Sequence, residues 1–345
     1  MHIHEYIFAA LVIIAILLAS NLMLTMTTEP LKVASEREGL KRIAQSIMTQ
    51  ILLNPGDPAD WGSNTTIDEN SLRSFGLAYQ SRTVREAYVL DADKILRLLN
   101  DENPFYISPQ KVSELLGLNT REYGFTIEIL PQFNVDVEEN SGGYKVSVRS
   151  IDGINPIQNA NVTAKIYYLQ DNQVSDSSLI SSVTGPDGAC TINFDGASSA
   201  SAVAIFVVDY RGMRVPKVFV PPESSIQRAC LVGQKLSLSV SSEMIDEVIA
   251  PIKDGECEIC NVSFEWRIGG DGFTDVDYVE PGTIVALAAT ADGKLLVARR
   301  FIDRVEYGTV SLSSSSLPLG FMLEKMVSVE GFSYIVRFYV WRLVW

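Results

Sequence analysis

The hydrophobic pattern begins with one uninterrupted run. No charged residue occurs between Ile7 and Met26, and about 20 residues at a rise of 1.5 Å match the roughly 30 Å hydrocarbon core of a bilayer. The preceding sequence, MHIHEY, lacks Lys and Arg, which favours a retained span over a cleaved signal peptide. We therefore predict that residues 1–28 form a short tail and a transmembrane α-helix.

A second helical pattern follows this run. Leu40, Ala44, Ile47 and Ile51 recur at the spacing of one helix face, among charged and polar residues. The pattern predicts an amphipathic helix whose apolar stripe packs either on its own domain or on neighbouring copies of the chain. Together with the short helical and strand patterns after it, this helix is expected to build an α+β membrane-proximal domain over residues 29–150.

Two local signals lie within this predicted domain. Turn-forming residues are dense from Asn54 to Ser71, and Trp61 lies among them, which indicates an ordered loop pinned by an aromatic side chain. Ser108 followed by Pro109 is typical of the start of a helix. The sequence thus predicts that the long amphipathic helix ends at the loop.

Alternation of apolar and polar residues with period two begins near residue 125 and predicts an antiparallel hairpin that closes the first unit near Ser150. Short β-rich runs separated by Gly, Pro, Asp and Ser turns predict a β-sandwich over residues 151–222 and a C-terminal β-rich domain over 223–345. The last run is too short for a second span and carries Arg337 and Arg342, so a long strand buried on both faces is preferred over a membrane helix. Because the run ends at the terminus, the strand is expected in a central sheet position. The expected fold class is a transmembrane helix followed by a mainly β extramembrane region.

The predicted sandwich resembles the Ig-like or prealbumin-like modules that are repeated in cell-surface proteins. In those modules a P-x-x-x-A-x-V strand precedes a T-x-x-D-G hairpin. The matching residues here are Pro156, Ala160, Val162, Thr184, Asp187 and Gly188. The resemblance implies a spacer or adhesive module.

Composition and charge restrict the classes of function. The chain has 345 residues, of which 47% are hydrophobic and 20% charged, so it is expected to fold into more than one packed unit. Its formal net charge of −14 would repel the phosphate backbone of nucleic acid. Nucleic acid is therefore excluded as an expected partner.

Histidine chemistry is absent from the large domain. The two histidines, His2 and His4, precede the predicted span, so Ser-His-Asp catalysis and His-based zinc ligation are not expected beyond it. An enzyme would need carboxylates or lysines alone, and scattered acidic residues on an acidic protein are usually solvated. We predict no catalytic site, no bound cofactor and no enzymatic activity.

The four cysteines leave several alternatives open. Structural disulfides are favoured, such as one between Cys190 and Cys230 and one between Cys257 and Cys260, because the count is even and the chain is expected to be exported. The alternative interpretations of these cysteines are zinc ligation, a thioredoxin-type C-x-x-C motif and buried free thiols.

One acidic segment has the residue types of a calcium loop. Carboxylates cluster around glycines between residues 270 and 280, although their spacing is not that of an EF-hand. The weak candidate ligands are Asp271, Asp275, Asp277 and Glu280. A solvated acidic turn between strands is the favoured alternative.

The predicted side of the membrane rests on two opposing signals. Basic residues follow the predicted span, which would place the C-terminal bulk inside the cell: Lys32, Arg37, Lys41 and Arg42. Three glycosylation acceptor motifs favour the outside: Asn64, Asn161 and Asn261. Anchored strand-rich modules are also the usual build of surface proteins. We expect a single-pass protein with its C-terminal bulk extracytoplasmic.

The N-terminal sequence resembles the type IV pilins or pilin-like proteins of archaea. Glu5 lies at the edge of an apolar helix that leads into an amphipathic stretch and then a β domain. The resemblance implies that Glu5 meets the amino terminus of a neighbouring subunit and that the helix forms the core of a filament. This chain departs from the family in lacking a basic leader with a small residue at a cleavage point.

Two functions are expected from the sequence. The first is a membrane-anchored cell-surface or envelope protein with a structural or binding role. The alternative is a pilin-like subunit of a type IV pilus-like filament or secretion apparatus. The expected partners are the lipid bilayer, other copies of the chain and other envelope proteins.

Overall fold

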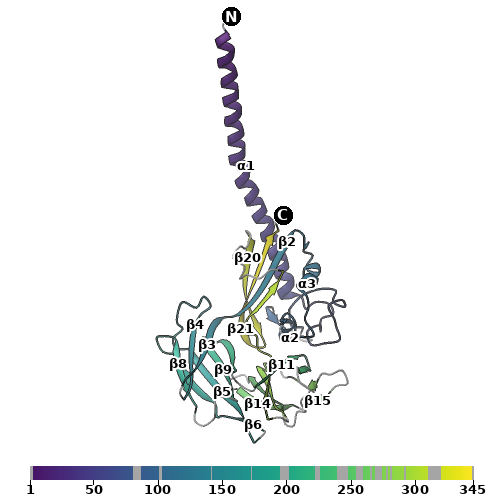
Figure 1. Ribbon diagram of the computed structural model, residues 1–345, viewed down its shortest axis with the longest axis vertical. Helices are drawn as coiled ribbons and strands as arrows, with labels where there is room; N and C mark the ends of the chain where they lie inside the picture. Colours follow the sequence, from purple (N-terminus) through teal and green to yellow (C-terminus); the bar gives the residue numbers. More distant parts are fainter. Residues whose placement is uncertain are drawn as a thin grey trace.

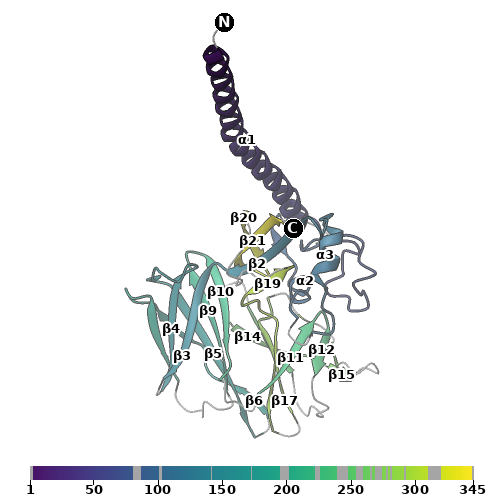
Figure 2. The same cartoon turned by 45° about the horizontal axis from the view of Figure 1, so that its top comes forward.

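The protein is a β-rich body from which one long helix extends (Figures 1 and 2). The computed structural model describes residues 3–80, 87–100, 103–140, 142–171, 173–194, 202–221, 226–238, 248–253, 259–264, 266–268, 274–276, 279, 282–290, 293–309 and 320–343. The helices within these ranges are α1 (Ile3–Leu53), α2 (Ala92–Leu96) and α3 (Pro109–Leu115).

Within the part of the chain that the structure describes, no helix is both long and apolar enough to cross a membrane. The prediction of an N-terminal transmembrane helix is therefore wrong. The apolar run does not form a helix of its own, because α1 continues through Pro30 into the charged residues Glu36, Arg37 and Glu38 as one helix of 51 residues.

The second half of α1 packs on the body of its own chain. The predicted apolar stripe is confirmed, since Leu40, Ala44, Ile47 and Ile51 are at most 8% exposed. The contacts of α1 with other elements are mainly with strands β20 and β21. Packing on its own domain, one of the two predicted alternatives, is thus confirmed for this half of the helix.

A five-stranded sheet provides this packing surface. Its order is β1 (Val89–Leu90), β20 (Gly320–Val329), β21 (Phe332–Arg342), β2 (Tyr123–Pro131) and β19 (Val305–Gly308). The prediction of a central position for the last strand is confirmed, because β21 pairs with β20 on one side and with β2 on the other. Strands from distant parts of the sequence therefore form the surface under α1.

Two further sheets face each other in a sandwich-like arrangement. One contains β10 (Met213–Phe219), β9 (Ala202–Tyr210), β5 (Asn161–Gln170), β6 (Gln173–Asp176) and β7 (Ile180–Val183). The other contains β3 (Phe133–Asn140), β4 (Gly143–Ser150) and β8 (Ala189–Asn193). Val146 and Ile192 from the smaller sheet share one buried core with Val162 and Phe206 from the larger.

The turn residues noted in the sequence close this sandwich. The Thr184 hydroxyl donates to the carbonyl of Ile157 at 2.8 Å and accepts from the amide of Ala160 at 2.9 Å. The amide of Gly188 donates to the carbonyl of Gly185 at 2.9 Å, and Gly188 has a φ of +73° that favours glycine. Thr184 therefore fixes the start of β5 against the hairpin that leads into β8.

The remaining strands form an eight-stranded sheet. Figure 2 places it beside the sandwich and below the loop that follows α1. Its order is β14 (Ile259–Phe264), β13 (Val248–Lys253), β17 (Val285–Ala289), β18 (Leu295–Arg299), β11 (Gln227–Val232), β12 (Lys235–Leu238), β16 (Thr274–Val276) and β15 (Trp266–Ile268). Among the described residues, strands far outnumber helices, which confirms the mainly β prediction for the region beyond α1.

Four tyrosines in the described cores are almost inaccessible, and burial is the first cause that raises the pKa of each phenol: Tyr144, Tyr167, Tyr307 and Tyr334. For Tyr144 the pKa rises to about 12. An unfolded chain ionises its tyrosines near pH 10. The contribution of these buried phenols to the stability of the folded state is therefore fully present below that pH and is lost as the pH rises through their folded-state pKa.

We expect these tyrosines to ionise together with unfolding, in one steep step above about pH 10. An alkaline titration that records tyrosinate absorbance and circular dichroism in parallel would measure both events. Tyr144→Phe should make the stability less dependent on pH in this range. Complete ionisation near pH 10 with native circular dichroism would contradict the expectation.

Candidate functional site

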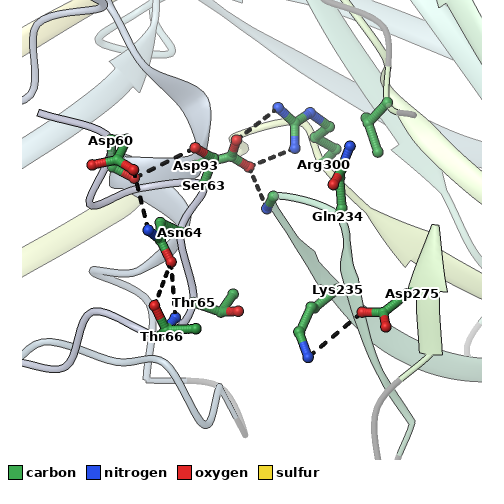
Figure 3. A pocket seen from close by; sticks show the side chains of 12 residues that line it. Asp60, Ser63, Asn64, Thr65, Thr66, Asp93, Gln234, Lys235, Asp275 and Arg300 are labelled. Atoms are coloured by element: carbon green, nitrogen blue, oxygen red, sulfur yellow. Dashed lines mark hydrogen bonds and ion pairs between the residues drawn. The ribbon is translucent and has the colours of Figure 1, made fainter. Parts of the chain in front are cut away.

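A hollow of about 590 Å³ lies between the loop that follows α1 and the eight-stranded sheet (Figure 3). Polar side chains from the loop form one wall: Asp60, Ser63, Asn64, Thr65 and Thr66. The opposite wall comes from the β11–β12 turn and β16: Gln234, Lys235 and Asp275. Asp93 and Arg300 lie at the inner end. Segments that are far apart in the sequence thus meet around one polar space.

A buried ion pair closes the inner end of the hollow. Arg300 Nη1 lies 2.5 Å from Asp93 Oδ1, and Arg300 Nη2 lies 2.9 Å from Glu330 Oε1. Asp93 Oδ1 also accepts from the amide of Gly233 at 2.8 Å, and Glu330 Oε2 accepts from the amide of Gly282 at 3.1 Å. Asp93 and Arg300 are each only 6% exposed, so these contacts are shielded from solvent.

Arg300 keeps its positive charge in this buried position. Burial alone would lower its pKa, but the carboxylates of Asp93 and Glu330 raise it, and the net shift is upward. The guanidinium therefore remains protonated and joins three elements: the start of α2, the end of β18 and the β20–β21 turn. Its ion pairs with Asp93 and Glu330 hold these three elements together.

Sequence reasoning missed this network. Arg300 lies in the run LLVARRFI, where a charge inside an apolar strand pattern is a signal of a buried partner. The identity of the partners had no such signal, because Asp93 lies 207 residues away. Only the folded chain brings the three charged groups together.

The loop wall is held from beneath by Arg97, which is 1% exposed. Its guanidinium donates to the carbonyl of Trp61, to that of Ile67 at 2.6 Å and to that of Phe105 at 2.8 Å. Burial lowers the pKa of Arg97 to about 10, so it stays charged at neutral pH. The guanidinium also lies 5.6 Å from the ring centroid of Trp61. The wall is therefore fixed to the body.

Trp61 itself confirms the predicted aromatic pin. Its side chain is fully buried, and its indole N–H donates to the carbonyl of Gly76 at 3.2 Å. The ring lies 5.8 Å from that of Phe75. The loop of residues 54–71 is thus held by a side chain that points into the core.

Asn64, one of the predicted glycosylation sites, lies half-buried in this wall. Its side-chain Nδ2 donates to Asp60 Oδ2 at 3.1 Å, and its Oδ1 accepts from the Thr66 hydroxyl at 2.6 Å. Asn161 is exposed at the first position of β5, and Asn261 belongs to β14. Glycosylation at these three positions stays a prediction.

The opposite wall closely approaches the loop at its base. Gly233 has a φ of +59°, and a Cβ atom added there would lie 2.2 Å from the carbonyl oxygen of Ser63. Only glycine fits this contact. Further out, Lys235 Nζ lies 3.5 Å from Asp275 Oδ1. The two walls are therefore joined at the bottom and open above.

The predicted calcium ligands are only partly within the described residues. Asp275 pairs with Lys235, whereas Asp271, Asp277 and Glu280 lie outside the described residues. Within the described ranges no group of three or more His, Cys, Asp or Glu residues could hold a metal ion. Calcium binding stays a prediction.

The predicted Cys190–Cys230 disulfide is wrong. Both residues are thiols, as is Cys260. Cys190 lies on β8 in the sandwich core, whereas Cys230 lies on β11 in the eight-stranded sheet, so the two cysteines belong to different sheets. Burial raises the pKa of the Cys190 thiol, which reduces its thiolate fraction. Cys257, the predicted partner of Cys260, lies outside the described residues.

Comparison with protein-family models, with curated proteins and with solved structures finds no match to this chain.

Proposed function

We propose that this chain is a pilin-like subunit of a filament or secretion apparatus, and that α1 joins neighbouring copies. One observation carries the proposal: α1 is a single helix that packs on its own body through the stripe that begins at Leu40, while the described large apolar side chains between Phe8 and Leu18 are exposed on every side. The β-rich body is then the part that faces outward from the assembly.

The length of α1 suits this role. Its 51 residues extend over about 77 Å, and Figures 1 and 2 show the first half projecting away from the body. The second half is fixed to β20 and β21 through Ile47, Met48 and Ile51. A helix anchored at one end in this way presents its free half in a defined direction.

The free half contains an apolar segment, residues 8–18. Its large apolar side chains are between 41% and 71% exposed: Phe8, Leu11, Val12, Ile13, Ile14, Ile16, Leu17 and Leu18. Consecutive positions cover the whole circumference of a helix, and a helix that is apolar all round is normally buried. A contiguous apolar patch of this size marks an interaction site.

Copies of the same segment are the proposed cover. A bundle of parallel copies surrounds each helix with apolar neighbours on all sides, which matches the distribution of these side chains. The N-terminal resemblance to pilins assigns the same role to this region. Glu5 belongs to α1, and its contact with the amino terminus of a neighbouring copy is part of the proposal.

The sandwich is the proposed spacer or adhesive part of the subunit. The proposal is supported by the contacts of Thr184 and Gly188, two of the residues on which the resemblance to Ig-like or prealbumin-like modules rests. The sheets lie at the far side of the body from the free end of α1 (Figure 1). A binding module at this position would project from the surface of an assembly.

The proposal is tested by replacing Ile14 with Asp in the full chain. A carboxylate in the apolar segment cannot be buried among apolar neighbours without a large desolvation cost, so we expect the ordered multimers of the parent protein to be lost. Electron microscopy and sedimentation of material sheared from cells and of purified protein would measure this. Ser46→Asp, which adds the same charge to an exposed position on the covered half of α1, is the matched control.

The outcomes separate two occupants of the apolar segment. Ordered multimers that form without lipid, and that Ile14→Asp but not Ser46→Asp abolishes, support the proposal. A chain that stays monomeric without lipid and floats with vesicles of phosphatidylcholine and phosphatidylglycerol would overturn it in favour of the bilayer alone.

A further inference from the structure

The geometry points to a binding site for a small neutral carbohydrate in the hollow between the loop that follows α1 and the β11–β12 turn. The inference is independent of filament assembly, since the lining residues all belong to one chain. It rests on the polarity of the lining, on the pairing of its charges and on the fixed position of both walls.

The lining is suited to hydroxyl groups. Thr65, Thr66, Asn64 and Gln234 bring hydroxyls and amides to the two walls (Figure 3). Such groups both donate and accept hydrogen bonds, as the hydroxyls of a sugar do. Val279 is the one apolar side chain among the described residues that line the hollow. The other apolar surface of the hollow belongs to the aliphatic parts of polar side chains, which suits a ligand that carries both C–H and O–H groups.

The charges of the lining favour a neutral ligand. Arg300 is held by Asp93 and Glu330, and Lys235 lies beside Asp275. The third carboxylate of the lining, that of Asp60, accepts a hydrogen bond from Asn64, so the lining carries three carboxylates and two cations. A carboxylate or phosphate ligand would have to compete with these carboxylates for each cation. The paired carboxylates can still accept hydrogen bonds from a neutral hydroxyl, and the paired cations can donate to it, without a change in the net charge of the site.

The size of the hollow also fits. Ligand pockets in proteins typically have volumes of roughly 300–1,000 Å³, and this hollow has about 590 Å³. A monosaccharide or disaccharide is of the corresponding size. A folded protein domain is far too large to enter.

Both walls are held in place before any ligand arrives. Arg97 binds three carbonyls of the loop and its neighbourhood, and the close approach of Gly233 to Ser63 fixes the β11–β12 turn. The ion pair of Asp93 with Arg300 joins these two regions at the inner end. Fixed polar groups lose little entropy on binding, which favours recognition of a small polar ligand.

The test is saturation-transfer NMR on the full chain with glucose, galactose, mannose and N-acetylglucosamine as separate probes. We expect saturable binding of at least one of these sugars. Thr65→Val removes one hydroxyl while preserving shape, and Gln234→Ala removes one amide. Each should weaken that binding by roughly 2- to 10-fold, the effect of one neutral hydrogen bond.

The matched control is Thr191→Val, which makes the same change at an exposed position of β8, outside the hollow. It should leave the affinity unchanged. Circular dichroism and thermal melting would verify that each variant is folded. Absence of saturable binding by all four sugars overturns the inference. So does equal weakening by Thr65→Val and Thr191→Val, or preferential binding of the charged probes citrate and free lysine.

Discussion

Replacing Arg300 with Met is expected to lower the free energy of unfolding by about 3–5 kcal/mol, the usual cost of removing one partner from a buried ion pair. Asp93 and Glu330 would then remain buried with no cation between them. Their desolvation is offset in the parent protein by the guanidinium, which Met cannot replace. Urea denaturation followed by circular dichroism would measure the difference.

Lys217→Met is the control for this change. Lys217 Nζ lies 2.9 Å from Asp303 Oδ1, but the Asp303 side chain is 50% exposed, so the loss should be below about 1 kcal/mol. A triple variant that also carries Asp93→Asn and Glu330→Gln should recover part of the stability lost with Arg300. Equal effects of Arg300→Met and Lys217→Met would show that the buried network contributes no more than a surface pair.

Trp61→Ala is expected to lower the free energy of unfolding by about 3–5 kcal/mol, as truncation of a large buried aromatic side chain does. The change leaves a cavity beside Phe75, removes the hydrogen bond to Gly76 and takes away the ring that faces Arg97. The wall of the hollow would lose its support at the same time. Denaturant titration would measure stability, and proteolysis between residues 54 and 71 would report on the loop.

Tyr79→Ala is the matched control for Trp61→Ala. Tyr79 follows the same loop, but its side chain is 53% exposed, so its truncation should cost less than about 1 kcal/mol. Slow proteolysis of the loop in Trp61→Ala, at the rate of the parent protein, would show that Arg97 alone holds the wall.

The sequence predicts elements whose burial follows a simple period. The stripe of Leu40, Ala44, Ile47 and Ile51 follows from helical spacing, and the central position of β21 follows from a strand that is apolar on both faces. Both inferences use only neighbouring residues. Local patterns of this kind are set by the backbone geometry itself.

Long-range pairing could not be predicted in the same way. The partner of β2 is β21, which lies about 200 residues later, and the Asp93–Arg300 pair spans 207 residues. The transmembrane prediction rested on one apolar window, whereas the structure has this window within a continuous 51-residue helix, and no helix among the described residues is long and apolar enough to cross a membrane. The Cys190–Cys230 disulfide failed because an even number of cysteines does not specify which layers the chain directs them into.

The central position of β21 has a consequence for the order of events on the ribosome. About 280 residues separate the end of α1 at Leu53 from the start of β21 at Phe332. At roughly 5–20 residues per second, their synthesis takes roughly 14–56 s. Strand β20 (Gly320–Val329) is made directly before β21, so for nearly all of that interval the stripe of α1 lacks both strands that later cover it. The nascent chain would therefore expose two apolar surfaces of α1, residues 8–18 and the stripe, and the stripe is covered only when translation has delivered β21. A chaperone that shields the helix would act within this interval.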